Sequence, residues 1–401
     1  MSIRDEATAL SGDIVELRRA LHAEPEIGLD LPKTQRKVLD ALAGLPLEVS
    51  TGRAATSVTA VLRGGRPGPA VLIRGDMDAL PVTERTGLPF ASRHDGAMHA
   101  CGHDLHTAML AGAARLLAAR KADLPGSVIF MFQPGEEGHH GAKVMIEEGV
   151  LDAAGQRPVA AFALHVSSAM LPSGVCASRP GPMMAAADTL RVTVAGRGGH
   201  GSRPHAAADP IPAACEMVTA LQALVTRTFD VFDPVVITVG SFHAGTTDNV
   251  IPDQASFLAT VRSFSPESRD LVRETSLRLL NGIATAHGLK ATAEFADGYP
   301  VTVNDAGAVG FAERVIAGVL GDGHYLTAPN PVTGSEDFSY VLDQVPGAFV
   351  MLGACPADRD PATAPFNHSA EAVFDESVLA EGAAIYAELA LGALTEQAPG
   401  G

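Results

Sequence analysis

The stretch A-V-L-I-R-G-D-M-D, from Ala70 to Asp78, decides how this sequence is expected to fold. Its first four residues are apolar, as in a strand that is buried on both faces of a sheet. The strand runs directly into Asp76 and Asp78. In open α/β sheets, ligands bind just outside the carboxyl ends of the strands. The stretch therefore predicts a buried strand that carries two aspartates to the edge of a binding crevice.

Segments on both sides of this strand alternate between strand-like and helix-like patterns. We expect strands at 57–62, 127–132 and 159–164 and helices at 103–120 and 142–148. This alternation indicates an open α/β sheet. Glu136 and Glu137 come just after the strand at 127–132, and His165 follows the strand at 159–164. Three strands are therefore expected to bring polar side chains to one crevice.

A second informative stretch is M-H-A-C-G-H-D-L-H, residues 98–106. Cys101 and His103 are two residues apart, so in an extended segment they face the same side and can reach one metal ion. Sulfur, nitrogen and carboxylate oxygen together suit zinc or a neighbouring first-row metal better than magnesium or calcium. The alternative is a small buried cysteine beside an ordinary helix start. His106 lies one helical turn after His103 and either supports the site or packs.

Carboxylates complete the chemistry expected at this crevice. Metal-dependent hydrolysis needs one carboxylate to hold the ion and a second to take a proton from water, and the adjacent Glu136 and Glu137 can divide these roles. Asp76 and Asp78 can ligate a metal or accept the second hydrogen bond of a ligating imidazole. His368 lies in a loop rich in proline and alanine, where composition alone favours an ordinary surface histidine.

The pattern changes near R-P-G-P, residues 179–182, which indicates a hinge. Beyond it, a β-α-β-β-α-β order with alternating strands predicts a small two-layer α+β domain. Asp209 and Ser265, each followed by proline, mark the starts of its helices. After about residue 292 the chain returns to the first domain. We therefore expect one domain of residues 1–180 and 293–401, interrupted by an inserted domain of residues 181–292.

The inserted domain carries a glycine-rich turn, G-G-H-G-S-R-P-H at 198–205, which contains His200 and His205. The turn lacks the pattern of a phosphate-binding loop. Asn249 and Arg262 follow further along the chain. An arginine at the end of an apolar strand can clamp a carboxylate through two hydrogen bonds, and the alternative is a plain surface cation.

Composition narrows the class of protein. The chain has 401 residues, 46% of them hydrophobic, which is an ordinary globular composition. Its formal net charge of −17 argues against binding to nucleic acid or anionic membranes through a general basic field. The four cysteines are scattered, so we expect reduced thiols and a cytoplasmic location. We see no secretion signal at the N-terminus and no uncharged apolar run long enough to span a membrane.

Nine landmarks occur in order along the chain, and together they are far more specific than any one of them. They are L-H-A-E-P-E-I-G (21–28), R-G-D-M-D-A-L-P (74–81), M-H-A-C-G-H-D-L-H (98–106), Q-P-G-E-E-G (133–138), A-L-H-V (163–166), G-G-H-G-S-R-P-H (198–205), N-V-I-P (249–252), G-S-E-D-F (334–338) and F-N-H-S (366–369). With them the chain resembles the zinc-type metallopeptidase family of aminoacylases, hippurate hydrolases and auxin–amino-acid conjugate hydrolases, in its cysteine-containing branch.

This resemblance implies an α/β fold: a zinc-peptidase-like catalytic domain with a mixed, largely parallel sheet, plus an inserted α+β two-layer lid domain that forms a homodimer. It implies two divalent metal ions, zinc first and manganese or cobalt as alternatives. It implies a set of five metal ligands: Cys101, His103, Glu137, His165 and His368. It implies Glu136 as the general base and His200 as the donor to the oxyanion, while the choice between His200 and His205 as the lid histidine that contacts the substrate stays open. Asn249 and Arg262 are implied to hold the substrate carboxylate.

The resemblance further implies hydrolysis of the amide bond of small N-acyl amino acids. Two alternatives stay open. A dipeptidase or carboxypeptidase would use the same metal site and differ in the pocket for the acyl group. An inactive relative that binds a metabolite is the other alternative, and the presence of Glu136 and every ligand candidate counts against it.

Overall fold

The computed structural model describes residues 2–396, and the chain divides into two compact units. The first unit comprises Met1–Met183, Val303–Asn330 and Asp337–Gly401, and the second comprises Met184–Thr302 and Pro331–Glu336. The boundary expected after residue 292 has to be corrected, because it falls inside a strand, β13 (Lys290–Ala296), that pairs with β8 (Ala186–Ala195) of the second unit. The inserted segment therefore extends to Thr302.

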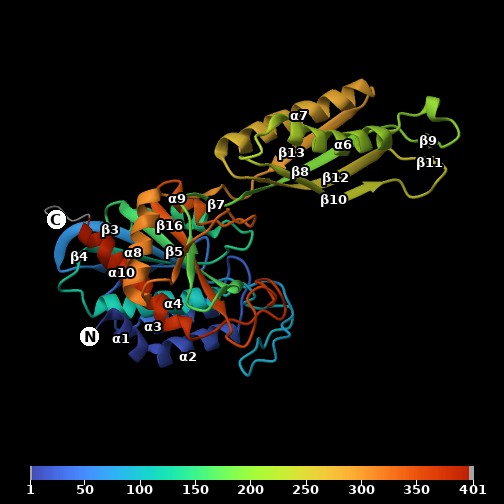
Figure 1. The fold of residues 1–401 in the computed structure, drawn as a ribbon. Coiled ribbons are helices and arrows are strands. Elements are labelled where there is room, and N and C mark those ends of the chain that lie inside the picture. The colour runs from blue at the N-terminus through green and yellow to red at the C-terminus, as the bar shows by residue number, and fades with distance from the viewer. Residues whose placement is uncertain (1, 397–401) are drawn as a thin grey trace. The chain divides into compact units, whose positions relative to one another are not determined.

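An eight-stranded sheet forms the centre of the first unit, in the order β1-β2-β4-β3-β5-β16-β6-β15 (Figure 1). Its strands are β1 (Glu48–Thr51), β2 (Val58–Arg63), β3 (Arg66–Asp76), β4 (Pro125–Gln133), β5 (Pro158–Pro172), β6 (Cys176–Ser178), β15 (Tyr325–Thr327) and β16 (Gly347–Cys355). β3 pairs in parallel with both β4 and β5, and β5 pairs in parallel with β16. β1, β2 and β4 are joined by antiparallel pairing. The prediction of a mixed, largely parallel sheet is confirmed.

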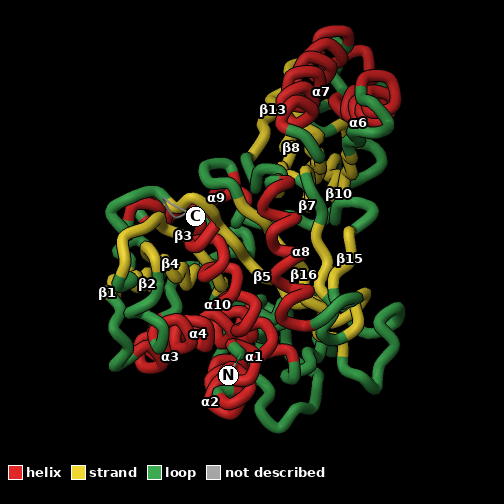
Figure 2. Tube along the Cα trace, turned by 60° about the vertical axis from the view of Figure 1, so that its left-hand side comes forward, coloured by secondary structure: helices red, strands yellow, loops and turns green. Residues whose placement is uncertain are grey.

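Helices α4 (His103–Ala118), α8 (Ala306–Leu320) and α10 (Val378–Glu396) pack against the sheet, and α10 also packs against both α4 and α8 (Figure 2). The N-terminal helices α1 (Ile3–Ala9), α2 (Ser11–His22) and α3 (Pro32–Leu42) pack against α4. Helix α10 is long and apolar enough to cross a membrane by length and composition alone, with a mean hydropathy of 1.4. However, 67% of this apolar stretch is buried inside the unit, as expected for a helix of the hydrophobic core.

Two short helices, α5 (Gly141–Glu147) and α9 (Ser339–Leu342), contact each other in the same unit. Helix α5 begins shortly after β4 and also packs against that strand. The turn between β4 and α5 carries Glu136 and Glu137, so both of its ends are held by elements of the core.

The fully buried Tyr386 of α10 joins two strands of the sheet. It donates a hydrogen bond to the carbonyl oxygen of Arg74 in β3 (2.6 Å) and accepts one from the backbone N–H of Leu164 in β5 (2.9 Å).

The second unit is a two-layer α+β domain. Its antiparallel sheet has the order β10-β12-β8-β13, with β10 (Val236–Ala244) and β12 (Gln254–Ser263). Helices α6 (Pro210–Thr228) and α7 (Pro266–Ala286) pack against this sheet, over a core cluster of its own. Both expected helix starts are present, since the side chains of Asp209 and Ser265 accept hydrogen bonds from backbone N–H groups of the first turn.

Candidate metal centre

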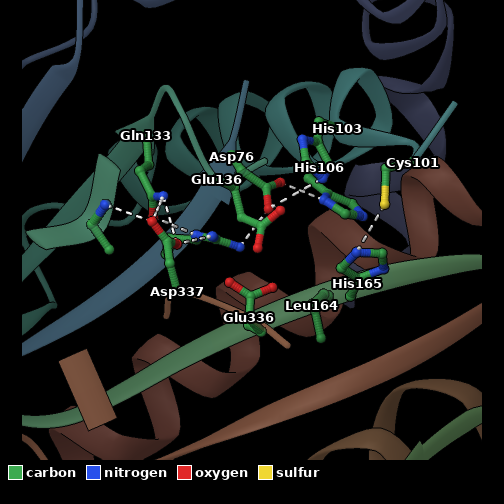
Figure 3. Close-up of polar contacts among 12 residues, drawn as sticks. Asp76, Cys101, His103, His106, Gln133, Glu136, Leu164, His165, Glu336 and Asp337 are labelled. Atoms are coloured by element: carbon green, nitrogen blue, oxygen red, sulfur yellow. Dashed lines mark hydrogen bonds and ion pairs between the residues drawn. The ribbon is translucent and has the colours of Figure 1, made fainter. Parts of the chain in front are cut away.

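The carboxyl ends of three neighbouring parallel strands gather the polar residues of the first unit. In the register of the sheet, Arg74 of β3 lies opposite Ala163 of β5, so Asp76 is carried to the level of His165 two residues further along. Strand β5 continues past the expected end at residue 164, so His165 lies within the strand. Figure 3 shows the side chains of Asp76, Glu136 and His165 turned toward the same region.

Ligand-type atoms of the predicted site residues lie close together in three overlapping sets. Within each set, one ligand atom per residue lies within 4.8 Å of the others, and the sets are Cys101–His103–His165, Cys101–Glu137–His368 and His103–Glu136–Glu137. Two pairs are in close contact: Cys101 Sγ lies 3.5 Å from His165 Nε2, and Glu137 Oε1 lies 3.2 Å from His368 Nε2. The structure therefore brings together all five predicted ligands and the predicted base.

Two of the histidines are oriented by their Nδ1 atoms. His103 Nδ1 contacts the carbonyl oxygen of Asp78, and His165 Nδ1 contacts that of Val166, both at 2.9 Å. A carbonyl only accepts, so each Nδ1 carries a proton, and Nε2 is the nitrogen whose lone pair the neutral ring would offer to a metal ion. His103 Nε2 is buried and has no hydrogen-bond partner among the described residues. Burial holds the pKa of His165 well below its ordinary value and so keeps this ring neutral.

The local field favours a positive charge at the centre. Burial alone would lower the pKa of His103, but the charge of Asp76 and the contacts with Asp78 and Cys101 raise it well above its ordinary value. Hydrogen bonds with Cys101 and Glu137 raise the pKa of His368 to about 10. An excess of negative charge that stabilises a proton also stabilises a metal cation. The thiol, imidazole and carboxylate donors and the orphaned His103 Nε2 therefore fit a divalent metal.

Asp78 supports the centre through three contacts. Its two carboxylate oxygens accept hydrogen bonds from the backbone N–H groups of Glu136 and Glu137, both at 2.9 Å, while its carbonyl oxygen receives His103 Nδ1. The turn that carries the two glutamates is thereby fixed relative to His103. This arrangement matches the supporting role that the sequence offered as one option for Asp78.

The carboxylate of Asp76 is engaged by neighbouring side chains of the first unit. It contacts Arg74 Nη1 and His106 Nδ1, each at 2.5 Å, and lies 3.6 Å from His103 Nε2. His106 Nε2 accepts the backbone N–H of Val166 at 2.8 Å, so both of its ring nitrogens are used. Since the pKa of Asp76 is held well below its ordinary value by Arg74 and the two histidines against the opposing effect of burial, the carboxylate is ionised and balances Arg74. His106 thus ties α4 and β3 to β5 beside His165.

Sequence reasoning missed two buried networks behind the centre. In one, Arg74 bonds Gln133 at 2.8 Å and Asp337 at 3.0 Å, while Asp337 accepts the backbone N–H of Ala142 in α5 at 2.9 Å. The landmark that contains Asp337 was a usable signal for this network.

In the other network, the fully buried Asp104 pairs with Arg18 and with His22, each at 2.8 Å. Because Asp104 directly follows His103, this network anchors the first turn of α4 and hence one predicted ligand. Both networks join residues more than 80 positions apart, which no local pattern reveals.

In the second unit, His200 and Asn249 lie together at one end. His200 belongs to β9 (Gly199–His200), which pairs with β11 (Val250–Ile251) next to Asn249. His200 Nδ1 accepts the backbone N–H of Ser202 at 3.2 Å, so the neutral ring carries its proton on Nε2 and can donate from there. His205 lies in an exposed one-turn 3-10 helix, Pro204–Ala206.

Arg262 lies in β12 of the four-stranded sheet, away from the β9–β11 pair. It is opposite Val236 in the register, at the far end of β12 from Gln254. Its Nη1 lies 3.4 Å from Ser335 Oγ, and burial lowers its pKa despite the opposing charge of Asp188. One chain therefore does not bring Arg262 together with His200 and Asn249.

The chain matches the family model described as Peptidase family M20/M25/M40 over residues 72–392. It belongs to this family. Three curated relatives cover nearly the whole chain. Thermostable carboxypeptidase 2 of Saccharolobus solfataricus is 37% identical over 97% of both chains. N-acetylcysteine deacetylase of Bacillus subtilis is 36% identical over 94% of this chain and 96% of its own. Hippurate hydrolase of Campylobacter jejuni is 36% identical over 98% and 99%.

A solved structure gives the same assignment for the M20 fold. The crystal structure of a Bacillus subtilis protein described as a dinuclear metal-binding peptidase of the M20 family has a TM-score of 0.82 and 34% identity, covering 97% of this chain and 99% of that one. The family resemblance inferred from the nine landmarks is confirmed. As an M20 protein with relatives of this kind, the chain is a hydrolase of amide bonds.

Proposed function

We propose that this M20 protein hydrolyses the amide bond of small N-acyl amino acids with two divalent metal ions held by Cys101, His103, Glu137, His165 and His368. The observation that carries the proposal is the cluster of these five residues with Glu136 beside them. The relatives named as a deacetylase and a hippurate hydrolase support the choice of substrate class. When bound, divalent ions polarise a carbonyl oxygen and bring the pKa of a coordinated water to about 7.

Glu136 acts as the general base in this proposal. The residue is 5% exposed and its carboxylate lies beside Glu137 and His103, while Glu137 is engaged with His368. Glu136 takes the proton of the attacking water and passes it to the leaving amine. His200 stabilises the oxyanion with its Nε2–H, a contribution of about 3–4 kcal/mol for one such donor. Arg262 and Asn249 hold the free carboxylate of the substrate.

Zinc is the first choice of metal, because a thiolate ligand favours it over manganese or cobalt. We also propose a cytoplasmic location, which is supported by the four free cysteines of the described chain. Direct measurement of metal content by elemental analysis, after reconstitution of the metal-free protein with each ion, tests the choice. Hydrolysis of hippurate that depends on added metal tests the activity itself.

A homodimer would bring Arg262 near the His200 and Asn249 of a second copy, although these residues lie apart within one chain. Between the levels of Ala255 and Arg262, β12 is about 24 Å long, too far for one amino-acid-sized substrate to meet both ends of the sheet. Strand β10 is the edge of this sheet and exposes Val236 and Phe242. Antiparallel pairing of two β10 edges places the Val236 end of one copy beside the Ala244 end of the other. Arg262 of one copy is then brought toward the glycine-rich turn of its partner.

Mixing two impaired variants, assayed with substrate well below KM, tests this arrangement. His200→Ala and Arg262→Ala proteins, dissociated and reassembled together, form hybrid dimers in which one of the two sites is intact. Recovery to about a quarter of wild-type activity is expected from random pairing. If activity stays at the level of the separate variants although hybrid dimers form, the site is not shared between copies.

Carboxypeptidase or dipeptidase activity is the second candidate, favoured by the 37% identical relative named as a carboxypeptidase. Both candidates use the same metal centre and the same carboxylate clamp. A panel of N-acetyl, N-benzoyl and N-aminoacyl derivatives of one amino acid separates them, because the acyl half is then the variable. A higher kcat/KM for the dipeptides than for the acyl derivatives would replace the first proposal with the second.

A further inference from the structure

Asn367 lies where three ligand-bearing segments of the first unit meet. These are the loop before α4 with Cys101, strand β5 with His165, and the loop that carries His368 itself. Only the family landmark drew attention to this residue in the sequence, and no site role was assigned to it there. Its side chain makes hydrogen bonds to both of the other segments.

The amide nitrogen of Asn367 holds two backbone carbonyls. Nδ2 donates to the carbonyl oxygen of Cys101 at 3.2 Å and to that of Val166 at 3.0 Å. The Val166 oxygen also accepts the Nδ1 proton of His165, so the group that orients this ring is itself held by Asn367. Nδ2 lies 3.8 Å from Cys101 Sγ as well, within reach of a weak N–H···S contact.

The amide oxygen of Asn367 is used on the opposite side. Oδ1 accepts the backbone N–H of Ser168 at 2.9 Å and the hydroxyl of Ser168 at 3.1 Å. A flipped amide would set its nitrogen against the N–H of Ser168 and its oxygen against two carbonyls, so the network allows one orientation only. The side chain is thus a bridge of fixed polarity between β5 and the loop of Cys101.

The next residue shows why such a bridge is needed. His368 has φ +74, an uncommon conformation for a residue other than glycine, and its side chain is 55% exposed. It belongs to no helix or strand, and its backbone N–H donates to the carbonyl oxygen of Ala100 at 2.8 Å. A conformation of this kind persists when the surroundings over-determine it. The bonds of Asn367 on one side and the bond to Ala100 on the other supply that restraint.

We propose that Asn367 is a positioning residue of the metal centre: its amide locks Cys101, His165 and His368 into one arrangement before metal binds. This inference rests on the proposed two-metal function. It predicts that the donating half of the amide matters most, since that half contacts the carbonyls beside two ligands.

The test measures metal affinity of the full-length protein, not only its activity. Zinc is titrated calorimetrically into metal-free wild type, Asn367→Ala and Asn367→Asp, with Asn281→Ala on the exposed surface of α7 as the matched control. Loss of a residue that supports metal ligands typically weakens binding about 10–100-fold, and we expect this for both Asn367 variants. Asn367→Asp keeps an oxygen for Ser168 but turns a second oxygen toward two carbonyls, so it should not rescue the alanine variant.

A spectroscopic readout separates positioning from general stability. In cobalt-loaded protein the sulfur-to-cobalt charge-transfer band reports the Cys101 contact, and we expect it to shift or weaken in both Asn367 variants while the unfolding midpoint of the Asn281→Ala control stays at the wild-type value. Should Asn367→Ala fail to fold, Ser168→Ala removes one bond to the amide and should weaken zinc binding by a smaller factor. Wild-type affinity and an unchanged cobalt band in the folded Asn367 variants would overturn the inference.

Different results would contradict the metal-dependent function and the positioning role of Asn367. If the wild type binds no zinc, the proposed metal-dependent function is lost and the inference with it. If the wild type binds two ions per chain and Asn367→Asp binds them equally well, the function stands and only the positioning role is removed.

Discussion

Replacing Asp78 by asparagine tests the geometry of the centre most directly. The carboxylate accepts the backbone N–H groups of Glu136 and Glu137, and Asp78 and Glu136 are buried while Glu137 is partly buried. Asparagine has the same shape but only one accepting oxygen, so one N–H then faces an NH₂ group. A hydrogen bond to a charged group contributes about 1.5–3 kcal/mol, and an orphaned buried donor costs about 1–3 kcal/mol. Since these two figures describe the same lost contact, we expect a net effect of about 2–3 kcal/mol.

This loss falls on the turn that carries the proposed base and one proposed ligand. If it appears in the transition state, kcat drops roughly 30–150-fold, since 1.36 kcal/mol corresponds to a factor of ten. The assay is steady-state hydrolysis of an N-acyl amino acid at saturating zinc, with KM expected to change little. Asp305→Asn is the matched control, because Asp305 also accepts a backbone N–H at a helix start, at 2.8 Å, but outside the centre. A kcat of Asp78→Asn within threefold of the Asp305→Asn value would refute the reasoning.

Three further outcomes are expected. Glu136→Gln should bind zinc like the wild type and lose about 10²–10⁴ in kcat, and near-normal turnover would exclude Glu136 as the base. Arg262→Ala should raise KM about 10–100-fold for substrates with a free carboxylate but not for their amides, and equal effects on both would exclude the clamp. The pKa of His22 is raised, because the charge and hydrogen bond of Asp104 and the hydrogen bond of Glu84 outweigh burial and Arg18. A histidine with a raised pKa in the folded state stabilises that state fully below about pH 6.5, and this contribution is lost as the pH rises through the folded pKa. The free energy of unfolding, measured with denaturant, should therefore fall less between pH 6 and 9 in His22→Gln than in the wild type. A parallel decline would remove His22 as the cause.

Elements with a local signal were predictable from the sequence. The apolar run before Asp76 and Asp78 indicated a strand buried in a parallel sheet, and that strand is β3, paired on both sides. Asp209 and Ser265 began helices as their types and the prolines after them indicate. Cys101 and His103 were expected to face one site from their spacing, and the structure places their ligand atoms within 4.8 Å of each other.

Features that depend on distant pairing were not predictable in this way. The end of the inserted segment was set too early, because residues 293–296 are strand only through their pairing with β8. His368 had no periodicity to place it, and its role as a candidate rested on the family resemblance. The bond from its backbone N–H to Ala100, 268 positions earlier in the chain, is a fact of tertiary structure.

The contacts of Asp76 show that a local sequence pattern can help to distinguish a metal ligand from a supporting residue. Sequence alone left it as a ligand or a supporting residue, and its carboxylate does lie 3.6 Å from His103 Nε2. Arg74 stands two residues earlier on the same strand and so shares its face. In the buried interior an arginine must be paired, and here it takes one carboxylate oxygen of Asp76 while His106 takes the other. With both oxygens engaged, Asp76 supports the histidines rather than competing for a metal, and the alternation R-x-D within a buried strand is the pattern that distinguishes these two outcomes.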